Sequence, residues 1–157
     1  MKKKTWKIYA FWIILAEAVG ALSGWLTSEG MKVYTETINQ PPLSPPPWLF
    51  PIVWGILYAL MGIGAARVSL APRSKERSLG LNLFVIQLIM NFFWSPIFFN
   101  AQVFGTALLW LILLWILVLS MVQIFRKVDK PAGNIQIPYL IWLTFAAYLN
   151  YGVWQLN

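Results

Sequence analysis

The stretch "SLGLNLFVIQLIMNFFWSPIFFNAQVFGTALLWLILLWILVLSMVQIF", residues 78–125, decides the fold because none of its 48 residues is charged. A single α-helix of that length would measure roughly 72 Å, more than twice the ~30 Å hydrocarbon core of a bilayer. The stretch must therefore fold back on itself, and the polar, proline-containing "SPIFFNAQ" (residues 95–102) is the expected turn. We predict two membrane-spanning helices, over residues 79–99 and 103–125.

The same criterion predicts three further spans on either side of this stretch. Residues 8–27 are apolar except for Glu17, residues 48–67 follow a proline-rich segment, and residues 134–156 carry no charge. Hydrophobic residues make up 59% of the chain and charged residues only 11%, unlike the composition of a soluble domain. We expect an all-α membrane protein: a five-transmembrane-helix bundle that forms one domain over residues 1–157.

Lysine and arginine residues predict the orientation of this bundle. With five spans, the N-terminus and the loops at 67–78 and 126–133 share one side, which holds eleven of the twelve basic residues; the other side holds only Lys32. The positive-inside rule then places the N-terminus in the cytoplasm and the C-terminus outside the cell membrane. Topology and attraction to anionic lipid account for the net charge of +7, so no nucleic-acid partner is expected.

Cysteine and histidine are both absent from the 157 residues. Their absence removes disulfides, thiolate chemistry, Cys/His zinc sites, Ser–His triads and histidine-ligated haem from consideration. We therefore expect no metal site and no required cofactor.

The segment "QPPLSPPPWLFPIVW", residues 40–54, contains six prolines and no charge. Proline fixes φ and lacks a backbone N–H, so residues 41–47 are expected to be stiff and non-helical. The second span is expected to begin near Pro46 or Pro47, where a missing N–H costs little. Residues 29–40 would then lie across the outer surface as a cap, and the proline segment would form the lid and one wall of a pocket for a flat apolar ligand.

The ten tryptophans include several that lie deep in their spans. An interfacial aromatic belt accounts well for Trp6 at the inner edge. Trp54, however, lies roughly 9 Å deeper than Trp48, and Trp142 falls near the midplane. We favour a pocket position for Trp54 and Trp142; a belt or lipid-facing position is the alternative.

Helical spacing groups polar and aromatic side chains on common faces. These groups are Trp54 with Tyr58; Gln87 with Asn91, Trp94 and Phe98; and Trp142 with Phe145, Ala146 and Leu149, beside Asn150. The amides could orient a mainly apolar ligand, or they could serve only as hydrogen-bonding groups between helices. Small residues at four-residue intervals, such as Gly20 with Gly24 and Gly62 with Ala66, predict close helix packing within the bundle, with a dimer contact as the alternative. Glu17 is either functional or held protonated or hydrogen-bonded.

Three stretches of this sequence resemble one known family. They are "WLFPIVWGILY" (48–58), "QLIMNFFWSPIFF" (87–99) and "WLTFAAYLNYGVW" (142–154), and they are similar to motifs of the TspO/translocator protein family, also called tryptophan-rich sensory proteins or peripheral-type benzodiazepine receptors. The proline of the first motif, Pro51, falls one position early. The resemblance implies a five-helix bundle, often dimeric, that binds protoporphyrin IX, haem-like tetrapyrroles and benzodiazepine-site ligands in a pocket beneath the first loop.

The resemblance also implies roles for individual residues. It places Phe50, Asn91, Trp94, Ala146 and Leu149 in the pocket, in addition to Trp54 and Trp142. These two tryptophans become candidate catalytic residues if the protein degrades protoporphyrin in the presence of light and oxygen. A receptor or sensor is favoured because it requires only the pocket; a protoporphyrin-degrading enzyme and a porphyrin transporter are the alternatives.

Overall fold

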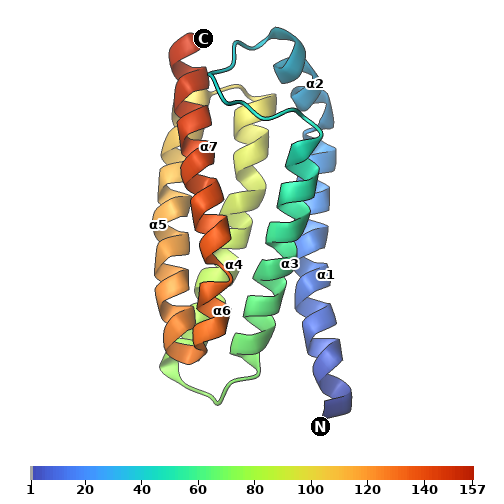
Figure 1. Cartoon of the computed structure of the whole chain (residues 1–157), viewed down its shortest axis with the longest axis vertical. Coiled ribbons are helices and arrows are strands. Elements are labelled where there is room, and N and C mark those ends of the chain that lie inside the picture. The colour runs from blue at the N-terminus through green and yellow to red at the C-terminus, as the bar shows by residue number, and fades with distance from the viewer. Residues whose placement is uncertain (1) are drawn as a thin grey trace.

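The computed structural model describes residues 2–157, a range that contains helices and no strands. Met1 and the side chains of Lys2 and Lys3, two of the basic residues counted above, lie outside the described part. The long helices run side by side along the molecule (Figure 1): α1 (Lys2–Leu26), α3 (Leu49–Ser69), α4 (Lys75–Ser95), α5 (Phe104–Val128) and α7 (Ile137–Leu156). Shorter elements join them: α2 (Ser28–Thr37), η1 (Pro96–Asn100) and α6 (Lys130–Asn134).

Four helical segments are long and apolar enough to cross a membrane: Lys4–Leu26, Leu49–Ser69, Lys75–Asn100 and Phe104–Val128. They coincide with four of the predicted spans. Helix α7 has 20 residues, including several tyrosine, tryptophan and amide side chains, and is not among these four segments. It also begins at Ile137 rather than at 134, because residues 130–134 form the separate helix α6. The fifth span therefore stays a prediction.

The proline-rich segment is non-helical, as expected, but the predicted start of the second long helix was too early. Helix α3 begins at Leu49, whose N–H donates to the carbonyl of Pro46 (3.0 Å). Proline disfavours the α region for the residue before it, so Pro47 opposes a helix that starts at Pro46 or earlier. Pro51 falls in the first turn of α3, where its missing N–H would have had no intrahelical partner.

Helix α2 covers one end of the bundle, the end that also holds the C-terminus (Figure 1). Tyr34 of α2 is buried against the rings of Phe98 and Phe99, with centroids 5.4 and 5.1 Å away. The segment that continues from α2 is fastened to α7. The side chain of Asn157 holds the backbone of Asn39: its Oδ1 accepts from the Asn39 N–H (3.2 Å), and its Nδ2 donates to the Asn39 carbonyl (2.9 Å).

The reversal between α4 and α5 is shorter than the predicted turn at 95–102. The chain stays helical through the π-type turn η1, where the N–H of Ala101 donates to the carbonyl of Pro96 (2.9 Å). Gln102, with φ of 55°, then redirects the chain into α5. Proline after α4 thus loosens the helix into wider hydrogen bonding without ending it at Ser95.

Helices α1 and α3 pack through small residues, as the glycine spacing predicted. A Cβ added at Gly62 would lie 2.4 Å from the Cα of Ile13, and one added at Gly20 would meet the ring of Tyr58. Nearer to α2 the two helices leave room, because a Cβ at Gly24 or at Gly55 would meet nothing within 4 Å, so the close packing predicted at Gly24 is wrong.

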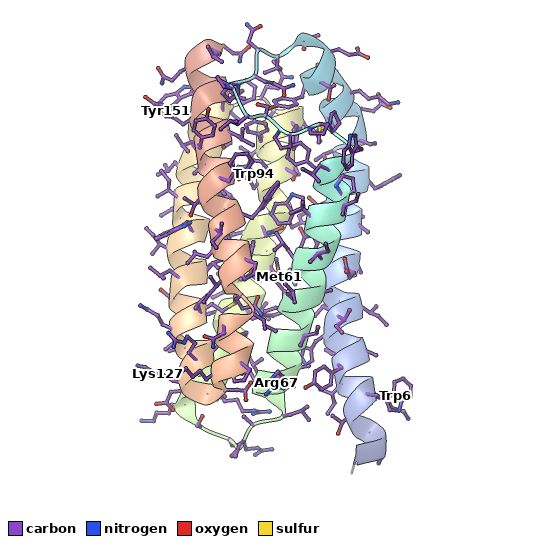
Figure 2. All side chains as sticks on the ribbon, viewed as in Figure 1. Trp6, Met61, Arg67, Trp94, Lys127 and Tyr151 are labelled. Carbon is purple, nitrogen blue, oxygen red and sulfur yellow. The ribbon has the colours of Figure 1, made fainter. Side chains whose placement is uncertain are left out.

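The opposite end of the bundle carries the basic residues. Figure 2 shows Arg67 and Lys127 at the end that holds the N-terminus, whereas Trp94 and Tyr151 lie toward the C-terminal end. At the basic end, the Arg67 guanidinium on α3 donates to Asp129 (Nε to Oδ2, 2.6 Å), and Asp129 also accepts from the N–H of Ala132 as the N-cap of α6. This ion pair ties α3 to the turn between α5 and α6.

Candidate functional site

A cavity of about 530 Å³ lies in the half of the bundle that α2 covers. Its walls come from α1, α3, α4, α5 and α7, and α2 and η1 contribute to it near the covered end. This volume is typical of small-molecule pockets, which are mostly apolar with a few convergent polar groups.

Most of the side chains predicted as site residues line this cavity. The eight that do so are Phe50, Trp54, Tyr58, Asn91, Trp94, Trp142, Ala146 and Leu149. Gln87 and Phe145 lie outside the lining. Gln87 is fully buried one helical turn below Asn91, and the ring of Phe145 packs against those of Trp142 and Tyr148. A ligand contact for any of the ten stays a prediction.

Aromatic rings form one continuous wall of the cavity. Trp54 and Trp142 meet edge to face, with centroids 6.4 Å apart and planes at 88°. Trp54 also lies 5.5 Å from the ring of Tyr58, and Trp142 lies 6.1 Å from the ring of Phe50. Because edge-to-face pairs satisfy the ring quadrupoles, this arrangement fixes the side chains while leaving ring surface toward the cavity.

Trp54 and Trp142 differ from three other tryptophans, of which Trp94 also lines the cavity, in their hydrogen bonding. The indole N–H groups of Trp94, Trp110 and Trp115 each donate to an acceptor in a neighbouring helix. Within residues 2–157, neither Trp54 nor Trp142 has a hydrogen-bond partner. Their two N–H donors are therefore free to interact with an acceptor in the cavity.

The buried amides make hydrogen bonds between helices, which was the alternative role considered for them. Gln87 Oε1 accepts from the hydroxyl of Tyr139 (2.8 Å). Asn150 Oδ1 accepts from the indole of Trp94 (3.1 Å), and its Nδ2 donates to the carbonyl of Phe104 (2.8 Å). Asn150 also lines the cavity, so one side chain both joins helices and contributes a polar group to the wall.

Sequence reasoning missed two tyrosines. Tyr139 lies three residues before Trp142 and accepts a hydrogen bond from Asn91 Nδ2 (2.7 Å). Tyr34 contributes to the cavity from α2, outside the segments long enough to span a membrane. Burial raises the pKa of Tyr34 to about 12, so its hydroxyl stays protonated at physiological pH. The i, i−3 spacing to Trp142 was the available signal for Tyr139.

The α1 side of the cavity is lined by Glu17 and by small residues. Glu17 is half-buried, and its carboxyl is the one acidic group in the lining. Gly24 of α1 and Gly55 of α3 both line the cavity where these helices separate. The small-residue faces thus have two uses: they bring α1 and α3 together at Gly62 and make room for the cavity at Gly55.

Membrane-length helices around an aromatic-walled cavity define an integral membrane protein. The chain belongs to the TspO/MBR family, whose sequence profile matches residues 12–155.

Similarity to known members extends over nearly the whole chain. This protein is 40% identical over 149 residues to tryptophan-rich protein TspO of Chlorobaculum tepidum, and the alignment covers 94% of each chain. It is 38% identical to protein CrtK of Rhodobacter capsulatus, covering 96% of this chain and 92% of that one. It is 35% identical to the translocator protein of Homo sapiens, covering 91% and 86%. Each of these alignments covers more than nine-tenths of this chain and most of the relative.

Proposed function

We propose that this protein is an integral membrane receptor or sensor whose cavity binds protoporphyrin IX and haem-like tetrapyrroles, as well as drug-like ligands of the benzodiazepine-site type. The observation that carries the proposal is the pair Trp54 and Trp142, whose rings meet at the cavity wall and whose N–H groups have no partner within the described residues. The names tryptophan-rich sensory protein and translocator protein, carried by relatives, are consistent with this function.

The tetrapyrrole acts as a ligand in this proposal, not as a resident cofactor. With no histidine or cysteine in the chain, binding rests on ring stacking, on burial of apolar surface and on a few polar contacts. Trp54, Trp142 and Phe50 supply ring surface. Asn91 and the free indole N–H groups supply the polar contacts.

In the proposed topology α7 is the fifth span, the N-terminus is cytoplasmic and the C-terminus is outside. The basic residues at the Arg67 and Lys127 end support it, because such residues are retained on the cytoplasmic side. A C-terminal reporter that is active only outside the cytoplasm should be active, and activity of a strictly cytoplasmic reporter would contradict the orientation. A homodimer is proposed from the family resemblance alone.

Titration of the purified protein with metal-free protoporphyrin IX tests the proposal. We expect saturable quenching of tryptophan fluorescence with one ligand per chain and competition by a benzodiazepine-site ligand. Linear, non-saturating quenching that matches partition into empty detergent micelles would contradict it.

A second function, light- and oxygen-dependent degradation of protoporphyrin, is favoured by the exposure of two oxidisable indoles to the same cavity. Loss of porphyrin absorbance in light but not in darkness, only when the protein is present, would establish this activity. Porphyrin flux into liposomes that contain the protein would instead establish a transporter. A receptor shows binding without either.

A further inference from the structure

A chain of hydrogen bonds begins at the cavity wall and ends in the apolar core. The hydroxyl of Tyr58 donates to Asn91 Oδ1 (2.5 Å), and Asn91 Nδ2 donates to the hydroxyl oxygen of Tyr139 (2.7 Å). Tyr139 donates to Gln87 Oε1 (2.8 Å), and Gln87 Nε2 donates to Met61 Sδ (3.8 Å). Tyr58 and Asn91 line the cavity, whereas the other three members lie deeper, with Met61 near the middle of the bundle (Figure 2).

All members of this chain are buried, with at most 6% of any of them exposed. Tyr139, Gln87 and Met61 also lie outside the cavity lining, so the buried polar groups of Tyr139 and Gln87 depend on their protein neighbours for hydrogen bonds. The series of hydrogen bonds also has a direction, because each member donates to the next one inward. Tyr58 donates its only hydroxyl proton to Asn91, so the Tyr58 hydroxyl can accept a hydrogen bond from a ligand but cannot donate one.

The same side chains can run the chain in the opposite direction. Rotating a carboxamide by 180° exchanges its oxygen and NH₂ at nearly the same positions, and a tyrosine hydroxyl proton can point either way. In the reversed chain Gln87 donates to Tyr139, Tyr139 to Asn91, and Asn91 to Tyr58. The one bond lost is that from Gln87 to the thioether of Met61, which is a weak acceptor. The proton of Tyr58 is then free to point into the cavity.

We propose that Gln87 and Tyr139 are positioning residues that set whether Tyr58 offers a donor or an acceptor to a molecule in the cavity. A flat ligand with an N–H or O–H group selects the direction seen in the structure, and one with a ring nitrogen or carbonyl selects the reverse. This inference rests on the proposed function, since it requires a flat ligand in the cavity. It adds that the site accepts both polarities, which suits tetrapyrroles, whose rings carry N–H groups and acceptor nitrogens together.

The variant Gln87→Met locks the chain in the reversed direction. It keeps the length of the side chain but removes the inner oxygen, so the buried proton of Tyr139 has Asn91 Oδ1 as its remaining acceptor. Asn91 must then donate to Tyr58, and Tyr58 becomes a fixed donor. Tyr58→Phe removes the hydroxyl through which the direction of the hydrogen bonds reaches a ligand in the cavity. Gln123→Met, at an exposed glutamine of α5, is the matched control.

The test compares the dissociation constants of carbazole, a flat N–H donor, and acridine, a flat nitrogen acceptor, from ligand fluorescence anisotropy at pH 8. Wild-type protein should bind both. Gln87→Met should weaken carbazole about tenfold relative to acridine, the size expected for one buried hydrogen bond. Gln123→Met should leave the ratio unchanged, and so should Gln87→Met when Tyr58→Phe is already present. Two results would overturn the inference and leave a purely structural role for Gln87. One is an unchanged ratio of the two dissociation constants in Gln87→Met; the other is the same change in that ratio when Gln87→Met is made in the Tyr58→Phe background.

The wild-type protein provides a measurement that does not depend on folding of the variants. Acridine should shift the side-chain amide nitrogen resonance of Gln87, which does not line the cavity, and carbazole should leave it in place. Equal responses to the two probes would overturn the inference. If protoporphyrin binds but neither tricyclic probe does, the inference alone fails; if none of the three binds, the proposed function fails.

Discussion

Trp54 of α3 and Trp142 of α7 meet edge to face at the cavity wall, with ring centroids 6.4 Å apart and ring planes at 88°. One indole therefore turns its edge to the face of the other, and both N–H groups lack a partner within the described residues. Two helices that are distant in sequence thus deliver matched aromatic groups to one site.

Replacing either tryptophan by phenylalanine should separate binding from photochemistry. Trp54→Phe and Trp142→Phe keep an aromatic ring and should each lose about 1 kcal/mol of protoporphyrin binding or less. Any photo-oxidative turnover should fall far more steeply, because phenylalanine is much harder to oxidise than indole. Trp6→Phe, at an exposed site far from the cavity, is the control and should change neither quantity. Wild-type turnover in both cavity variants would exclude tryptophan chemistry.

Metal-free protoporphyrin should bind about as tightly as haem. Stacking and burial do not involve the metal, and the chain has no histidine or cysteine to ligate it. Parallel titrations with the two compounds check this expectation. A hundredfold preference for haem, about 2.7 kcal/mol, would require a bond from the iron to a protein atom and would contradict the stacking account.

Two glycine substitutions should affect different properties: Gly55→Leu should weaken ligand binding, and Gly62→Ala should lower stability. Gly55→Leu places a side chain where a Cβ meets nothing within 4 Å, so folding should be retained while the added atoms occupy cavity volume and weaken porphyrin binding. Gly62→Ala should instead destabilise the protein by roughly 1–3 kcal/mol, because its Cβ would collide with the backbone of Ile13. Thermal unfolding in detergent and porphyrin titration measure the two effects. Normal binding by a folded Gly55→Leu protein would show that the ligand does not reach this part of the cavity.

The Arg67–Asp129 ion pair should make stability fall in acid. The hydrogen bond from Arg67 lowers the pKa of Asp129 in the folded protein. The ion pair therefore contributes fully to folding stability above the ordinary aspartate pKa near 4, and this contribution is lost as pH falls through the lowered pKa. Because both side chains are partly exposed, we expect about 1 kcal/mol at most. Asp129→Asn keeps an N-cap side chain for α6 but removes the charge, so its stability should lack this acid-dependent step. An identical pH profile for the variant and wild type would show that the pair contributes nothing.

The sequence predicted the spans well where charge alone defines them. Residues 8–27 contain only Glu17 as a charge, and the uncharged run 78–125 is too long for one span, so charge and length together predicted these helices. The boundaries at Leu49 and Ile137 were missed because they depend on local backbone stereochemistry beside Pro46 and on the separate helix α6. Hydropathy measures neither.

The site was predicted by depth and by helical face. Asn91 and Trp94, on one predicted face, line the cavity, whereas Gln87 on the same face lies one turn below the lining, because spacing does not reveal where a cavity ends. Tyr139 was missed because an aromatic residue in an apolar helix gives no sign of its hydroxyl partner. Its bonds to Asn91 and Gln87 exist only once α4 and α7 pack together.

The central claim, that flat tetrapyrroles bind against Trp54 and Trp142, is tested most directly by titrating the double variant Trp54→Ala/Trp142→Ala with metal-free protoporphyrin IX, using porphyrin absorbance as the signal. Truncating two aromatic rings of the cavity wall should weaken binding by at least tenfold, whereas Trp6→Phe should bind as the wild type does. Circular dichroism should confirm that the helices of the double variant remain folded. Wild-type affinity in the folded double variant would contradict the account, because the ligand would then bind elsewhere.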